Sequence, residues 1–249
     1  MSTTNDKTSL IERLFQAGSH FGFKKARRHP TTAQYLYTTK DGNDIFDLEK
    51  TSILLETAKE TLKEAGLHGK TVLFVGTKEE ASRIVTAAAE KSESPYVTNR
   101  WIGGMLTNFS EIKKRINRLE VLTNEKESGE LERKYTKKER VVLGREMDKL
   151  GFNFFGISKL QKMPDLMLVV DPRHDSIAVA EAQERNIPVI AIMSSDCDAN
   201  KVKFPVAVND SLQTSVSLVI HELADAYTEG KSAYVPKPVE SRPKAPVRR

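Results

Sequence analysis

Cysteine is almost absent from this chain of 249 residues, which contains one, Cys197. A single thiol excludes an internal disulfide and a Cys-x-x-Cys zinc site, and it fits a reducing compartment. The sequence also lacks a run of about 18 apolar residues, which a membrane span requires, and the basic-then-apolar start of a secretory signal. We therefore expect a cytoplasmic protein with no membrane contact.

The signature motifs of several enzyme classes are missing as well. The chain has no GxxxxGK[ST], GxGxxG, GxSxG or HExxH pattern. A short Gly76-Thr77-Lys78 turn after an apolar run could hold a phosphate, and acids near predicted strand ends, Asp171, Asp196, Asp198 and Asp210, could bind Mg²⁺ or act as acid and base. A nucleotide- or metal-dependent enzyme is thus an alternative, but we expect no enzyme and no cofactor.

Charge is unevenly distributed along the chain. Residues 1–164 carry 29 basic and 22 acidic side chains, a balance of +7, whereas residues 165–230 carry 4 and 11, a balance of −7. Residues 231–249 carry 6 basic and 1 acidic side chains, which brings the net charge of the whole chain to +5. Such polarity favours a polyanionic partner on one side of the molecule.

The segment from Gly18 to Pro30 alternates aromatics, glycines and cations, and it contains no carboxylate of its own. Its cations are Lys24, Lys25, Arg27 and Arg28. Basic and aromatic side chains together suit a phosphate backbone and unstacked bases, although a solvated basic loop is the simpler interpretation. His20 and His29 have no nearby Cys, Asp or Glu in the sequence, so we expect no metal site there.

Strand-like and helix-like segments alternate through the rest of the chain. Strands are predicted at 33–39, 44–48, 71–75, 95–98, 165–171, 188–193 and 204–208, and helices near 10–17, 48–66, 79–91, 174–185 and from 209 onward. This alternation predicts a mostly parallel sheet with helices on both faces.

Between residues 106 and 155 the pattern becomes that of two amphipathic helices. Phe109, Ile112 and Ile116 begin an apolar stripe, and Thr136 starts a Thr-x-x-Glu capping box before the second helix. We expect an antiparallel coiled-coil hairpin inserted into the α/β domain, with a basic outer surface or, alternatively, a solvated face that binds nothing. The predicted units are an α/β domain of residues 1–105 and 156–230, the hairpin 106–155, and a disordered basic tail 231–249.

The segment Asn99–Asn108 contains the only Trp, Trp101, next to Arg100 and a Gly-Gly pair. Glycines allow a sharp turn or a close approach to another surface. On chemistry alone, the indole either packs beneath the loop or stacks on something outside it.

Several short motifs are spread along the chain: GSHFG at 18–22, DLEKT at 47–51, LFVGTK at 73–78, NRWIGGMLTN at 99–108, MPD at 163–165 and NIPV at 186–189. Together they resemble the ribosomal protein S2 (uS2) family of the small ribosomal subunit, in its bacterial and organellar form, and they occur in family order from about residue 8 to residue 228. The resemblance implies a flavodoxin-like sheet with a protruding coiled coil. It also implies contacts with small-subunit rRNA between head and body, and with neighbouring ribosomal proteins, including the large protein built of repeated OB-fold domains.

The residues expected to contact RNA are mostly cations of the two basic regions and of the central motif. They are Lys24, Lys25, Arg27, Arg28, Arg100, Trp101, Lys113, Lys114, Arg115, Lys137 and Lys138. A protein-docking scaffold that touches RNA only incidentally is a further alternative.

Four features of the sequence depart from the family pattern. Phe23 stands where many members have His, and Asn153–Gly156 replaces a usual Gly-Gly-containing turn. The loop around Cys197 differs from the common Asp-Thr-Asn pattern, and the basic, Pro-rich tail is an extension whose partner the resemblance does not name.

Overall fold

A computed structural model describes residues 10–234 of the chain. Residues 1–9 and most of the tail predicted at 231–249, namely 235–249, lie outside this range. Lys231 and Ser232 belong to the last helix rather than to the tail. None of the described helices is both long and apolar enough to cross a membrane.

The central sheet has five parallel strands in the order β5-β4-β6-β7-β8. Its strands are β4 (Val72–Val75), β5 (Tyr96–Val97), β6 (Leu166–Val170), β7 (Val189–Met193) and β8 (Phe204–Ala207). In chain order this is the 2-1-3-4-5 arrangement of flavodoxin-like folds. The predicted parallel sheet is confirmed, and its three central strands, β4, β6 and β7, are buried along their whole length because both faces are covered.

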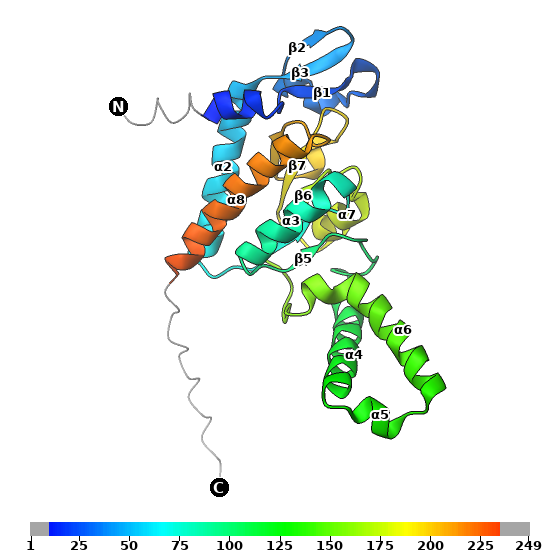
Figure 1. The fold of residues 1–249 in the computed structure, drawn as a ribbon. Helices are drawn as coiled ribbons and strands as arrows, with labels where there is room; N and C mark the ends of the chain where they lie inside the picture. The colour runs from blue at the N-terminus through cyan, green and yellow to red at the C-terminus, as the bar shows by residue number, and fades with distance from the viewer. Residues whose placement is uncertain (1–9, 235–249) are drawn as a thin grey trace.

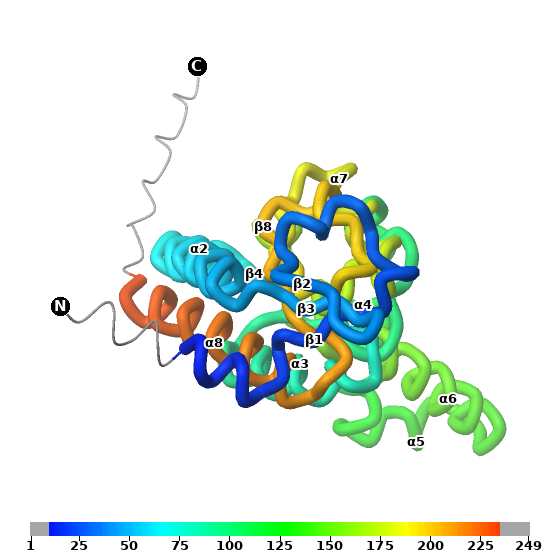
Figure 2. Tube along the Cα trace, turned by 90° about the horizontal axis from the view of Figure 1, so that it is seen from above, coloured from blue at the N-terminus to red at the C-terminus, as the bar shows by residue number. Residues whose placement is uncertain are grey.

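Helices cover the two faces of this sheet unequally (Figures 1 and 2). One face packs against α2 (Leu48–Leu67), α3 (Glu79–Lys91) and α8 (Gln213–Ser232). The other face packs against α7 (Ser176–Glu184) and the segment around Trp101. Where α2 crosses α8 the backbones approach so closely that a Cβ on Gly66 would lie 2.6 Å from Lys231 N, which explains a glycine within that helix.

A second, antiparallel sheet of order β1-β3-β2 lies at one end of the domain (Figure 1). Its strands are β1 (Phe21–Lys24), β2 (Leu36–Lys40) and β3 (Asn43–Phe46). The expected strand at 33–39 begins late, at Leu36, because Pro30–Tyr35 forms the 3₁₀ helix η2, which begins at a proline and whose N-cap His29 accepts the backbone N–H of Thr31. The basic segment, read as a loop, instead contains β1 and the 3₁₀ helix η1 (Lys25–Arg27).

The predicted hairpin projects from the opposite end of the domain (Figure 1). It comprises α4 (Phe109–Glu127), α5 (Glu130–Lys134) and α6 (Lys137–Phe154), followed by the 3₁₀ helix η3 (Phe155–Ile157). The capping box at Thr136 and Glu139 is confirmed. The connection between the two long helices is short, because α4 continues to Glu127 and α5 fills most of the remainder.

Candidate nucleic-acid interface

The N-terminal basic segment is fixed to the loop that follows β7. The backbone N–H of Phe23 donates to Ser195 Oγ at 3.0 Å, and that of His29 donates to Ser195 O at 2.8 Å. Thr32 Oγ1 donates to the same carbonyl at 2.7 Å. Because Ser195 is fully buried, these bonds fix the position of the segment while Lys24 and Lys25 remain exposed.

Arg28 is held by the carboxylate of Asp44, which is close in space although it lies outside the basic segment 18–30. Its guanidinium donates to both oxygens of Asp44, with Nε 2.8 Å from Oδ2, and also to Thr39 Oγ1. The Asp44 side chain is fully buried, and hydrogen bonding from Arg28 lowers its pKa despite the opposing effect of burial. The charge of Arg28, which we expected to contact RNA, thus already compensates a buried acid.

Arg27 lies closer to solvent than Arg28. Its guanidinium stacks 4.3 Å from the centre of the Phe23 ring and is 3.2 Å from Asp196 Oδ2. Arg173, which sequence reasoning missed, reaches the same oxygen at 2.7 Å. Two guanidinium groups on one carboxylate leave a local excess of positive charge.

Trp101 is buried, with 7% of its surface exposed. Its indole N–H donates to Glu181 Oε1 at 3.1 Å, and the backbone N–H groups of Gly104 and Leu106 donate to the same carboxylate at 2.8 and 2.9 Å. Burial of Glu181 opposes its ionisation, but these hydrogen bonds lower its pKa overall. Of the two alternatives for the indole, packing beneath the loop agrees with this burial, and Trp101 offers little exposed surface for the expected RNA contact. Arg100 beside it is exposed.

Glu181 has a weak sequence signal. It is an acid among apolar residues of α7, between Val179 and Ala182, on a face that becomes buried. A charge at such a position predicts a buried partner, but nothing in the spacing identifies residues 101–107 as that partner.

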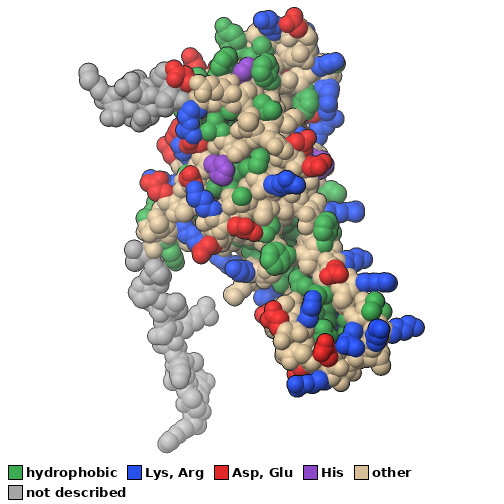
Figure 3. Space-filling model, in the orientation of Figure 1, with side chains coloured by type: hydrophobic (Ala, Val, Ile, Leu, Met, Phe, Trp, Pro, Cys, Tyr) green, Lys and Arg blue, Asp and Glu red, His purple; other side chains and the backbone are tan. Residues whose placement is uncertain are grey.

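The hairpin cations expected to contact RNA are all exposed. They are Lys113, Lys114, Arg115, Lys137 and Lys138. The hairpin lies far from the β1–β3 sheet, so the two basic regions sit at opposite ends of the domain (Figure 1). In Figure 3, Lys and Arg side chains gather along the right-hand edge, from the β1–β3 end to the hairpin.

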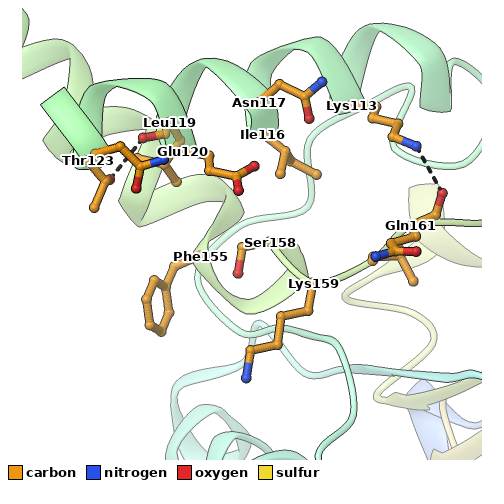
Figure 4. Close-up of a pocket in the computed structure, with 12 residues that line it drawn as sticks. Lys113, Ile116, Asn117, Leu119, Glu120, Thr123, Phe155, Ser158, Lys159 and Gln161 are labelled. Carbon is orange, nitrogen blue, oxygen red and sulfur yellow. Dashed lines mark hydrogen bonds between the residues drawn. The ribbon is translucent and has the colours of Figure 1, made fainter.

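A hollow of about 770 Å³ separates α4 from the chain after η3. Lys113 Nζ donates across it to Gln161 O at 3.3 Å, while Ile116 faces its interior (Figure 4). This hydrogen bond ties the base of the hairpin to the α/β domain. It also shows that Lys113 is partly engaged within the chain.

The residues of the enzyme alternative do come together at the carboxyl edge of the central sheet. Lys78 Nζ is 3.2 Å from Asp171 Oδ2 and 3.4 Å from Asp210 Oδ1, so an internal cation lies between the two acids. Asp196 instead binds the two arginines described above, and Asp198 caps the 3₁₀ helix η4 (Ala199–Lys201). This arrangement is a closed ion-pair cluster.

Potential metal ligands also lie at this edge of the sheet. Among residues 10–234, potential ligand atoms gather only at Asp171, Cys197 and Asp210, within 4.8 Å of one another. Burial raises the pKa of the Cys197 thiol far above its usual range, which disfavours the thiolate that a metal would need. Lys78 already supplies positive charge to both acids, so the donor set does not fit a resident metal ion.

These features define an α/β protein with flavodoxin-like strand order, a projecting helical hairpin and a cation-rich edge. The chain belongs to the ribosomal protein S2 family, whose sequence model matches residues 14–230. It is 41% identical over 222 residues to "Small ribosomal subunit protein uS2" of Dictyoglomus thermophilum, a match that covers 89% of this chain and 90% of that protein. The protein of the same name from Picosynechococcus is 41% identical over 223 residues, with 90% and 86% covered. "Small ribosomal subunit protein uS2c" of Emiliania huxleyi is 39% identical over 224 residues, with 90% and 97% covered.

Proposed function

We propose that this chain is a structural constituent of the small ribosomal subunit and acts in translation, not as an enzyme. The observation that carries the proposal is the family match, which extends over residues 14–230 and so includes both sheets and the hairpin. The names of the relatives point to the same particle. The closed Lys78 ion-pair cluster, in which an enzyme alternative would place its catalytic groups, agrees with a structural role.

The chain binds small-subunit rRNA between head and body through exposed cations. The contacting residues are Lys24, Lys25, Arg27, Arg100, Lys113, Lys114, Arg115, Lys137 and Lys138, with Arg28 and Trp101 holding neighbouring backbone in place. The nine residues proposed to contact RNA are all exposed, which supports their role because phosphate neutralisation requires accessible charge. The same surface lies beside other small-subunit proteins, including the large protein of repeated OB-fold domains.

The chain is organised as an α/β domain of residues 1–105 and 156–230 with an inserted coiled coil of residues 106–155. The bounds of α4 and α6 support the insertion, since they begin at Phe109 and end at Phe154. Ile112, Ile116 and Leu119 of α4 share one buried cluster with Leu150 of α6, as the seam of a coiled coil requires.

Gradient sedimentation of a cell lysate tests the proposed function. The chain should travel with the small subunit at low salt and should leave it when the salt concentration is raised. A chain that stays at the top of the gradient, while complete small subunits lacking it sediment normally, would contradict the proposal.

A further inference from the structure

A small hollow lies where the hairpin returns to the α/β domain, and the proposed function assigns it no role. Its volume is about 220 Å³, and α3, β5, the end of α6 and η3 all contribute to its wall. Gly156 of η3 lies so close to Tyr96 of β5 that a Cβ on the glycine would come within 2.6 Å of ring carbon Cδ2. This close approach fixes η3 against β5 at one side of the hollow.

Aromatic rings form the apolar part of the wall. Phe152 and Phe155 are 61% and 68% exposed, and Tyr96 adds a half-buried third ring. The Phe155 ring points away from α4 (Figure 4). Exposed apolar side chains that gather around a hollow mark a binding site more often than isolated ones do. Phe155 also belongs to the segment Asn153–Gly156, in which this chain departs from its family.

The polar groups of the wall are amides and hydroxyls, and no charged side chain lines it. Asn99 Nδ2 donates to the carbonyl oxygen of Phe152 at 2.7 Å, which fixes the amide, and its Oδ1 has no hydrogen-bond partner among residues 10–234. Asn153 contributes a second amide. Aromatic faces combined with amide edges are the groups that proteins use to stack and hydrogen-bond an unpaired nucleobase.

Cations surround the hollow on three different elements. Arg100 directly follows Asn99, Arg83 lies one turn before Thr86 on α3, and Lys149 lies one turn before Phe152 on α6. All three are exposed, and none of them forms an ion pair with another residue of the described range 10–234. Their charges are therefore available to phosphates on either side of a bound base.

Three acids on the same helices do not line this hollow. Glu79 lies two turns before Thr86 on α3. The Glu90 carboxylate accepts the Tyr96 hydroxyl at 3.3 Å and borders the neighbouring cavity, while Asp148 lines the hollow between α4 and α6. The space inside the aromatic wall thus contains no carboxylate that would repel a phosphate.

The size of the hollow also limits what it can hold. An α-helix is about 10–12 Å across and is too wide for it, whereas a single planar ring system fits. We infer that this hollow binds one unpaired nucleobase of small-subunit rRNA. The base stacks on Phe155 and Phe152 and meets the two amides at its edge, and the three surrounding cations contact the flanking phosphates. The inference rests on the proposed function and extends its RNA interface from Arg100 to the base of the hairpin.

Filter binding of small-subunit rRNA to variants of the full chain tests the inference. Phe155→Ala should weaken binding about tenfold, the usual effect of losing one stacked ring. It should leave the slope of log affinity against log salt unchanged, because no phosphate contact is lost. Lys149→Ala should instead reduce that slope by about one. Phe155→Tyr keeps the ring and should retain most of the affinity.

Val142→Ala is the matched control, because Val142 is 58% exposed on the same helix as Phe152 but does not line the hollow. It should leave both affinity and slope unchanged. If the native chain binds rRNA and Phe155→Ala binds it equally well, the nucleobase site is wrong and the proposed function stands. If the native chain does not bind rRNA at all, both are wrong. A Phe155→Ala variant that keeps its rRNA affinity but loses a neighbouring ribosomal protein would make the hollow a protein-binding site and would also overturn the inference.

Discussion

The carboxylate of Glu181 accepts a hydrogen bond from the indole N–H of Trp101 at 3.1 Å, although 80 positions separate the two residues in the sequence. The same carboxylate accepts backbone N–H groups from the turn that follows, in which Gly104 has a φ of +88°. One buried acid on α7 therefore determines how the chain passes from the α/β domain into the hairpin.

Replacement of this acid should destabilise the domain. We expect Glu181→Ala to lower the free energy of unfolding by about 3 kcal/mol, because several buried donors would lose a charged acceptor. Denaturant unfolding followed by the fluorescence of Trp101, the only Trp, measures the change. Glu184→Ala, an exposed acid on the same helix, is the control and should change stability by less than about 0.5 kcal/mol. Equal effects of the two variants would show that Glu181 does not hold the turn.

Substitution of Arg27 and substitution of Arg28 should affect different properties: Arg28→Ala should mainly lower stability, and Arg27→Ala should mainly weaken RNA binding. Arg28→Ala leaves Asp44 buried without a counter-charge, and we expect a loss of about 3 kcal/mol in the free energy of unfolding. Arg27→Ala should cost less than about 1 kcal/mol, because its guanidinium is largely exposed, but it should weaken RNA binding. Thermal unfolding and filter binding of small-subunit rRNA separate the two effects.

The Arg28 pair also predicts a pH dependence. The pKa of Asp44 is lowered in the folded state, so its contribution to stability is present above the pKa of an unfolded Asp. This contribution is lost as the pH falls through the lowered, folded-state pKa. Arg28→Ala should reduce that loss of stability at low pH. If the native protein and the variant lose stability equally as the pH falls, the Arg28–Asp44 pair is not its source.

Lys24 and Lys25 should act through phosphate neutralisation. The double variant Lys24→Ala, Lys25→Ala should reduce the slope of log affinity against log salt by about 2, roughly one for each cation removed. Binding to small-subunit rRNA measured between 50 and 200 mM salt, at about four concentrations, gives the slope. The double variant Lys70→Ala, Lys201→Ala removes two exposed lysines outside the proposed interface and should leave the slope unchanged.

The sequence predicts most of the helices and strands but not their long-range pairing. α3 was expected at 79–91 and has those bounds, because an Ala-rich amphipathic segment with acids in its first turn is a strong local signal. The strand order is not local: parallel neighbours such as β4 and β6 are joined through the whole hairpin, and nothing in either strand specifies the other. The late start of β2 was missed because η2 precedes it.

At the candidate interface too, local features can be predicted from the sequence, whereas contacts with distant residues cannot. Exposure of Lys24 and Lys25 follows from their own polarity, as do the exposed cations of the hairpin. The compensation of Arg28 by Asp44 depends on how β1 pairs with β3, and the burial of Trp101 depends on α7. Side chains whose contacts are made with a distant partner are the ones whose surroundings the sequence alone does not predict.

The ion-pair cluster at the carboxyl edge of the sheet should make stability fall as the pH rises from about 4 to about 6. Burial, reinforced by the nearby charge of Asp171 and opposed by Lys78, raises the pKa of Asp210 to about 6. Between the usual Asp pKa and this value the folded state binds more protons than the unfolded state, so protonated Asp210 stabilises the fold at the acid end and this contribution is lost with rising pH.

Because other acids, including Asp44, act in the opposite direction, the quantity to measure is the difference in unfolding free energy between the native sequence and Asp210→Asn at each pH. That difference should decline from about pH 4 to about pH 6. A flat Asp210 difference would mean that Asp210 stays ionised across this range, held by Lys78 as a permanent ion pair.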